Sequence, residues 1–79
     1  MIRGTGRYKT ASGLVVNIFE IKANGATFNC HGYIAVPRSR GRFKHEWNIW
    51  AEDGRFRAVG KHRWDIVEFL GAGNGQQQP

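Results

Sequence analysis

Four cations stand at every second position in the stretch RSRGRFK, which spans residues 38 to 44. On an extended strand, such side chains project to one side at intervals of about 6 to 7 Å, which suits contacts with successive phosphates of a nucleic-acid strand. No acidic residue follows until Glu46. We predict that this stretch contacts a nucleic-acid backbone, and a hairpin tip with solvated cations is the alternative. The four residues are Arg38, Arg40, Arg42 and Lys44.

A second group of cations follows the turn signal at Asp53 and Gly54. We expect residues 55 to 59 to form a strand that pairs with residues 42 to 50, so that the two basic groups form one patch. Acidic residues of the same hairpin, such as Glu52, could instead pair with these cations, at about 0 to 1 kcal/mol for each exposed pair. The second group consists of Arg55, Arg57, Lys61 and Arg63.

Aromatic residues make up 13% of the chain, and three tryptophans lie between residues 47 and 64. In proteins that bind single strands, exposed rings stack on bases, and each stacked base contributes about 1 to 3 kcal/mol. The even positions from Phe28 to Val36 and the odd positions from Phe43 to Ile49 are predicted to face the core. Tyr33 and Trp50 fall out of phase with these positions, so both are candidate stacking residues. Trp47, Phe43 and Phe56 are predicted to fill the core.

Residues that could support catalysis are few and scattered. The three histidines lie far apart, no Gly-rich loop precedes a helix, and no motif surrounds a Ser or Cys nucleophile. Cys30 has apolar neighbours at Phe28 and Ile34, which predicts a buried, unreactive thiol. We therefore predict a protein that is not an enzyme, with no catalytic residue, no metal site and no cofactor.

The size and charge of the chain limit its organisation and its partners. Seventy-nine residues allow one domain, and a chain of this size buries only about 60% of the surface that its unfolded form exposes. A possible homo-oligomer would bury more. Twelve Lys and Arg against six Asp and Glu give a net charge of +6. This charge favours a polyanionic partner, either nucleic acid (DNA or RNA) or an acidic protein, unless it serves solubility alone.

Turn signals at regular intervals divide the chain into short segments rich in β-branched and aromatic residues. This pattern is typical of an antiparallel meander. We expect an all-β, mainly antiparallel fold, a small SH3-like or OB-like barrel of about five to six short strands. Gly32 is predicted to mark a bulge or bend. The expected strands cover residues 6 to 10, 14 to 22, 26 to 36, 42 to 50, 55 to 59 and 65 to 70.

The C-terminal part of the chain allows two interpretations. Residues 65 to 70 favour a strand, but the spacing of Trp64, Val67 and Leu70 also fits a helix, and the alternative fold is a two-sheet β-roll with a short C-terminal helix. We expect residues 1 to 70 to form the domain and residues 71 to 79, rich in Gly and Gln, to be a disordered tail. No apolar run has the length of a membrane span or signal peptide, which predicts a cytoplasmic protein without membrane contact.

Several turn and core positions together resemble a loose pattern seen in small uncharacterised β-rich proteins of phages and prophages. The pattern joins a Y-x-T-x-x-G opening, a glycine-centred strand, a W-x-x-x-G-R-[FY] hairpin and a closing D-[IL]-V strand. The resemblance covers about residues 6 to 68 and implies a mobile-element accessory protein, without an established activity. The matching residues are Tyr8, Thr10, Gly13, Gly32, Trp50, Gly54, Arg55, Phe56, Asp65, Ile66 and Val67.

These patterns predict a small basic binding module that contacts nucleic acid through phosphate-directed Arg and Lys, with little sequence specificity. The alternative is a protein-interaction module, either a homo-oligomer or an inhibitor of an acidic host protein. Residues 14 to 21 favour this alternative because they are apolar on both faces, so the second strand or the C-terminal strand could pair with a partner.

Overall fold

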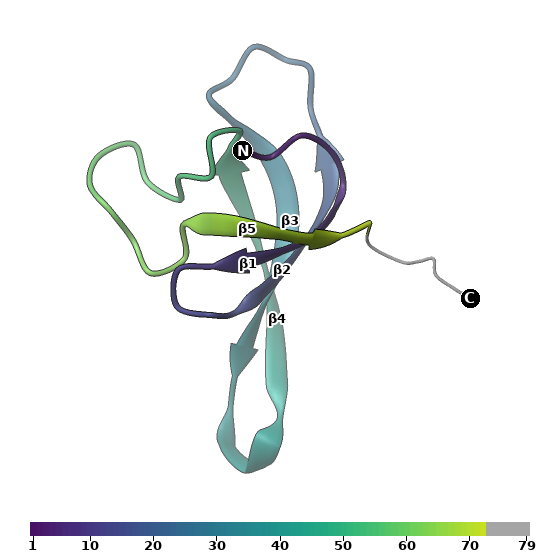
Figure 1. Cartoon of the computed structure of the whole chain (residues 1–79), viewed down its shortest axis with the longest axis vertical. Helices are drawn as coiled ribbons and strands as arrows, with labels where there is room; N and C mark the ends of the chain where they lie inside the picture. Colours follow the sequence, from purple (N-terminus) through teal and green to yellow (C-terminus); the bar gives the residue numbers. More distant parts are fainter. Residues whose placement is uncertain (73–79) are drawn as a thin grey trace.

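The computed structural model describes residues 1–72 as one antiparallel sheet joined by turns and loops (Figure 1). The sheet order is β4-β3-β2-β1-β5, and each neighbouring pair is antiparallel. The elements are β1 (Gly6–Thr10), β2 (Val15–Ile21), β3 (Phe28–Pro37), the 3-10 turn η1 (Ser39–Gly41), β4 (Phe43–Ala51) and β5 (Ile66–Gly71).

The all-β antiparallel prediction is confirmed, and five of the six expected strands are present. The sheet is open, because β4 and β5 lie at its two ends and are not paired with each other. It twists strongly, so that β5 crosses the direction of β3 and β4 in Figure 1. Within residues 1–72 the structure is therefore a curved open sheet rather than a closed barrel.

The buried core lies on one face of the sheet, where alternate residues of the strands point inward. In β3, Cys30, Gly32 and Ile34 are buried, as the period of two predicted. In β2, Val16 and Ile18 are buried while their neighbours face solvent. β2 therefore has apolar residues on both faces, with Val16 and Ile18 in the core and Val15 and Phe19 on the outer face. The complete core cluster is Ile2, Tyr8, Val16, Ile18, Cys30, Ile34, Trp50 and Ile66.

The predicted orientation of β4 is wrong. Trp50 is fully buried, whereas Trp47 is 50% exposed and Phe43 is 57% exposed. The cause is the register, because Cys30 pairs with Trp50 and residues that pair across an antiparallel ladder share one face. The outer end of this hairpin extends past the core, so both of its faces meet solvent. Phe43 lies at this end and is exposed, although it alternates with polar residues as a buried residue would.

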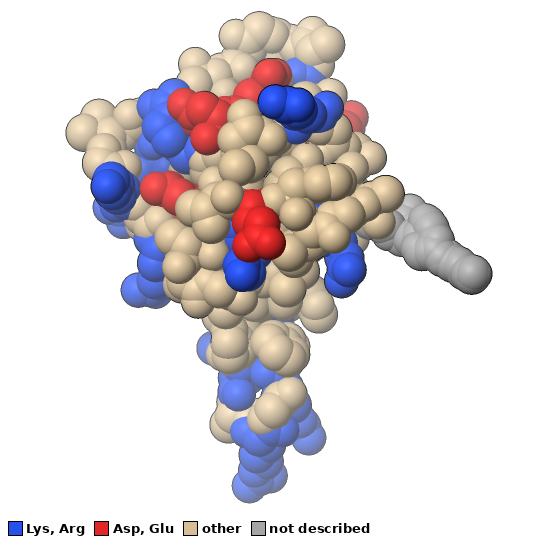
Figure 2. Space-filling model, in the orientation of Figure 1, with Lys and Arg blue, Asp and Glu red and all other residues tan. Residues whose placement is uncertain are grey.

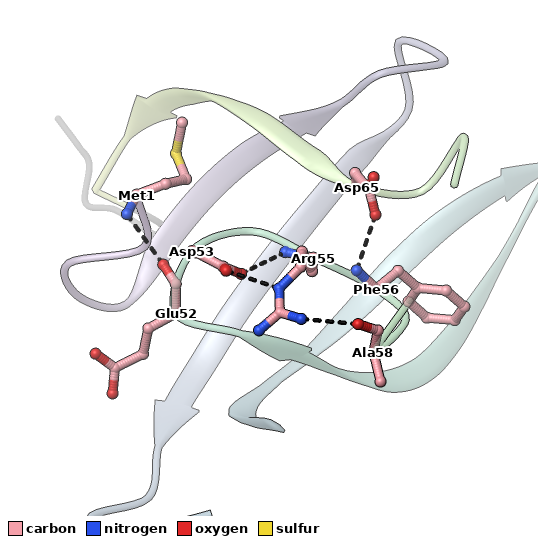
Figure 3. A network of polar contacts seen from close by, with 7 residues as sticks. All are labelled: Met1, Glu52, Asp53, Arg55, Phe56, Ala58 and Asp65. Carbon is pink, nitrogen blue, oxygen red and sulfur yellow. Dashed lines mark hydrogen bonds and ion pairs between the residues drawn. The ribbon is translucent and has the colours of Figure 1, made fainter. Parts of the chain in front are cut away.

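Residues 55 to 59 form a loop instead of the expected strand. Asp53 holds the loop at one end, since its carboxylate accepts hydrogen bonds from the backbone N–H and the Nε of Arg55 (Figure 3). Asp65 holds the other end by accepting the backbone N–H groups of Phe56 and His62, at 2.9 and 3.0 Å. The loop is thus fixed by two carboxylates.

This loop packs against the buried indole of Trp50. The Trp50 Nε1–H donates to the carbonyl oxygen of Trp64 at 2.8 Å, which satisfies the polar atom of a buried ring. Phe56 fills the space between them, with ring centroids 5.6 Å from Trp50 and 5.2 Å from Trp64. The prediction that Phe56 belongs to the core therefore holds in part, because its ring is half-buried against the core cluster.

The C-terminal segment of the described chain is strand β5, as favoured over a helix, and it continues through Gly71. The β-roll with a C-terminal helix is therefore not observed in residues 1–72. None of the residues described forms a helix that could cross a membrane. The predicted disorder of the tail concerns mainly residues 73 to 79, which lie outside the described residues.

Gly32 lies at a close approach between β2 and β3. A Cβ atom at this position would lie 2.7 Å from the carbonyl oxygen of Asn17 and 2.9 Å from Cδ1 of Ile18. The expected bulge is on the opposite strand, where the pairing shifts between Ile18 and Glu20. Gly32 is therefore required because the backbone of β2 passes too close for a side chain.

We expect Gly32→Ala to lower the free energy of unfolding by about 1 to 3 kcal/mol, because overpacking forces the backbone apart. Gly4→Ala is the matched control, since a Cβ there would meet no atom within 4 Å. Urea denaturation followed by tryptophan fluorescence measures both variants. Equal stability of the two variants would contradict the proposed close approach.

Candidate nucleic-acid interface

The β3–β4 hairpin projects beyond the body of the protein and ends in a short ordered tip (Figure 1). The last pair of the ladder is Pro37 with Phe43. Beyond it, the Arg38 N–H donates to the Arg42 carbonyl oxygen at 2.7 Å, and Arg40 adopts a left-handed backbone with φ of 60°. The backbone therefore turns tightly through η1 at the end of the hairpin.

The tip carries the four cations of the first basic group, all exposed (Figure 2). The predicted single row is wrong, because η1 interrupts the extended strand between Arg38 and Arg42, and Arg40 within it has a left-handed backbone. Arg38 lies 3.8 Å from Glu46, a contact at the limit of an ion pair. In residues 1–72, the other three form no ion pair. These three are Arg40, Arg42 and Lys44.

The second basic group lies apart from the tip, on the loop between β4 and β5 (Figures 1 and 2). The expected single patch is therefore wrong, because residues 55 to 59 do not pair with β4. Arg57, Lys61 and Arg63 are exposed on this loop. Figure 2 shows basic side chains on the loop, separated from the tip by uncharged surface.

Arg55 is engaged within the loop itself. Its Nε donates to Asp53 Oδ2 at 2.7 Å, and its Nη1 donates to the carbonyl oxygen of Ala58 at 3.0 Å (Figure 3). The hydrogen bond from the backbone N–H of Arg55 lowers the pKa of Asp53 below the ordinary value, and the Arg55 guanidinium lowers it further by a smaller amount. Arg55 therefore stabilises the loop, and we leave it out of the proposed phosphate-contacting set.

Tyr33 is exposed as predicted, and it lies in a cluster of rings on the outer face of the sheet, opposite the core. Phe19 stacks on Tyr33 with ring centroids 5.3 Å apart and an angle of 28°. His31 lies 6.5 Å from Phe19 and 5.5 Å from Trp47. We call Phe19, His31, Tyr33 and Trp47 the outer ring cluster. Trp50, the other predicted stacking residue, is buried and takes no part in it.

A row of residues that pair across the strands crosses the same outer face. The pairing places Arg7 opposite Asn17, Asn17 opposite Tyr33, and Tyr33 opposite Trp47, so that these residues form one line across four strands. Beside the line is a hollow of about 500 Å³, lined by Arg7, Val15, Asn17, Tyr33, Ala35 and His45. The hollow therefore combines apolar walls with an amide, an imidazole and a guanidinium.

Sequence reasoning missed Phe19, His31 and Trp47 as members of an exposed cluster. The sequence predicts Trp47 in the core, and nothing in it separates Phe19 from the rest of an apolar strand. The two-sided apolar character of residues 14 to 21 is a signal for Phe19 alone, since it indicates apolar residues on an outer face, while His31 and Trp47 join it only through the register of the sheet.

Residues 1–72 contain no group of three or more His, Cys, Asp or Glu that could hold a metal ion. The Nδ1 of His62 accepts the backbone N–H of Trp64, so this imidazole closes a turn. Burial raises the pKa of the Cys30 thiol to about 11, with a smaller contribution from the charge of Glu52. The thiol is therefore protonated at neutral pH.

We expect Cys30 to react slowly with a disulfide reagent such as DTNB at pH 8 in the native protein, because the reactive thiolate is scarce well below a pKa of about 11. In denaturant, the thiol becomes accessible and its pKa returns toward the ordinary value, so one equivalent should react at once. Absorbance of the released thiolate measures both rates. A fast stoichiometric reaction in buffer would contradict a buried thiol.

A second hollow, of about 740 Å³, lies near the N-terminal segment and β5. Its lining includes Met1, Tyr8, Val67 and Phe69, so it is mostly apolar. Val67 is 50% exposed and Phe69 is 55% exposed. Exposed apolar side chains therefore lie on β5, which is an edge strand of the sheet.

Comparison with family models, with curated proteins and with solved structures found no match to this chain.

Proposed function

We propose that this protein binds nucleic acid and that the cations of the hairpin tip contact its phosphates. The observation that carries the proposal is the tip itself, a projecting basic turn on which Arg40, Arg42 and Lys44 have no ion-pair partner in residues 1–72. Cations that are already solvent-exposed and unpaired require little desolvation before they meet a phosphate. The excess of positive charge over the whole chain adds attraction at longer range.

Binding of this kind has a characteristic dependence on salt. Each phosphate contact releases condensed counterions, so the logarithm of the binding constant falls linearly with the logarithm of the salt concentration. Arginine and lysine contacts to phosphates distinguish one sequence from another poorly. We therefore propose a module of low sequence specificity. The exposed loop cations Arg57, Lys61 and Arg63 make a weaker, separate contribution.

We expect replacement of Arg40, Arg42 and Lys44 by Ala to reduce the salt slope for duplex DNA by about 2 to 3, because each lost contact removes about 0.9 from the slope. Fluorescence-anisotropy titrations with a labelled duplex, between about 50 and 200 mM salt, measure this slope. Thermal unfolding should change little, since these side chains are exposed and lie beyond the core.

The matched control replaces Arg57, Lys61 and Arg63 by Ala, which removes the same charge from the loop. A smaller change in slope for this control would support contacts localised at the tip. Equal changes in the two triple variants would mean that only net charge matters, and the proposed role of the tip would then be wrong. No detectable binding by the unmodified protein at the lower salt would remove the whole proposal.

A protein-interaction module is the second candidate, and the position of β5 favours it. Among residues 1–72, β5 pairs with no strand except β1, so its other edge is open to another chain beyond Ile66, whose N–H donates to the Gly54 carbonyl oxygen at 2.8 Å. Exposed apolar side chains on such an edge favour strand addition. The second strand, which was also predicted to pair with a partner, is excluded because β2 lies between β1 and β3.

If β5 joins two copies of the chain, sedimentation velocity should show a dimer whose fraction rises with protein concentration. Val67→Lys should shift it to monomer, because a charged residue on an edge strand opposes pairing. Val59→Lys is the control, since Val59 is 84% exposed but lies on the loop. A monomer at every concentration, or a dimer that Val67→Lys leaves unchanged, would contradict self-association through β5.

A further inference from the structure

We propose that the outer face of β2, β3 and β4 is a base-stacking surface that makes single-stranded nucleic acid the preferred ligand. This inference rests on the proposed function and assigns a ligand class to a surface separate from the hairpin tip. It depends on the outer ring cluster, on the hollow beside it, and on the charges that surround both.

The rings of the cluster are accessible although they contact one another. Phe19 and Tyr33 are each 45% exposed, and Trp47 is 50% exposed. Large apolar rings gathered on an open sheet face leave that face poorly hydrated, and an unpaired base can cover it through its own π-face. Bases within a duplex are already stacked on both sides, so duplex DNA cannot use this surface. The cluster therefore favours single-stranded over double-stranded nucleic acid.

The hollow adds to this surface polar side chains that could bind the edge of a base. Asn17 lies between Arg7 and Tyr33 in the row across the sheet, and its amide offers both a donor and an acceptor. Val15 and Ala35 supply apolar walls, while His45 lines the same hollow. An amide beside exposed rings is a common means of binding an unpaired base.

The charges on this face suit a polyanion. Arg7 and Lys9 lie on β1 at one end of the row, and Lys9 is paired with Glu68 at 3.0 Å. Glu20 is the partner of His31 in the ladder, and its carboxylate lies 3.9 Å from Lys22. Both acids have a cation beside them, so Arg7 is left as the unpaired charge on this part of the face within residues 1–72.

The same face leads from the rings to the basic tip. Trp47, His45 and Phe43 are alternate residues of β4, so their side chains follow one another along the outer face at intervals of about 6 to 7 Å. All three are exposed, and Phe43 lies in the last pair before the tip. A single strand stacked on the rings can therefore continue along β4 to the tip cations.

The test compares a labelled single strand of about 12 nucleotides with a duplex of the same length and sequence. Tyr33→Ala and Trp47→Ala should each weaken binding of the single strand by about tenfold, because stacking on one ring is lost. Binding of the duplex should change by less than about twofold, since its contacts are made to phosphates at the tip. Tyr33→Phe and Trp47→Phe keep a ring and should retain most of the affinity.

Phe69→Ala is the matched control, because Phe69 is 55% exposed but lies on β5, where its ring contacts Tyr8. It should bind the single strand like the unmodified protein. Thermal unfolding of every variant separates loss of the ring from loss of the fold, and the Phe variants keep the test valid if an Ala variant unfolds.

Three outcomes decide the inference. A loss confined to the single strand and to the ring-removing variants supports it. Equal binding of single strand and duplex, unchanged in these variants, overturns the stacking surface and leaves phosphate contact by the tip intact. Binding to neither ligand at about 50 mM salt overturns the proposed function as well.

Discussion

The register of the β3–β4 ladder decides which aromatic side chains are buried and which face solvent. The pairing of Cys30 with Trp50 places the indole in the core, and by the same alternation the pairing of Tyr33 with Trp47 places both rings on the outer face. A shift of one residue in β4 would exchange these two tryptophans, exposing Trp50 and burying Trp47. One register therefore determines both the packing of the core and the surface proposed to bind bases.

The buried Trp50 in turn organises the segment between β4 and β5. Its Nε1–H is satisfied by the carbonyl oxygen of Trp64, and this bond holds the end of the loop over the ring. Asp65 then accepts two backbone N–H groups of the loop, and the chain enters β5 directly afterwards. The loop thus completes the core from the side that no strand covers. Its cations are displaced from the hairpin as a consequence, which explains why two basic groups exist instead of one.

Alternation and turn residues in the sequence were sufficient to predict the all-β class, five strands and the core side of β3. They failed for β4, because the pairing of Tyr33 with Trp47 and of Pro37 with Phe43 puts these apolar residues on the outer face, and alternation alone does not say which face of a strand meets the core. They also failed for residues 55 to 59, because Asp53 and Asp65 fix a loop through backbone contacts that no local pattern reveals. The ring cluster could not be predicted because it joins three strands, and its members meet only once the register is known.

We propose that bound nucleic acid lies on the outer face of β2 to β4 and reaches the hairpin tip. Amide chemical shifts of isotope-labelled protein, followed by NMR during titration with a short single-stranded oligonucleotide, locate the bound strand residue by residue. We expect the largest shifts in residues 15 to 19, 31 to 35 and 40 to 47, while β5 changes little. Shifts confined to β5 and the N-terminal segment, or no shifts at all, would contradict it.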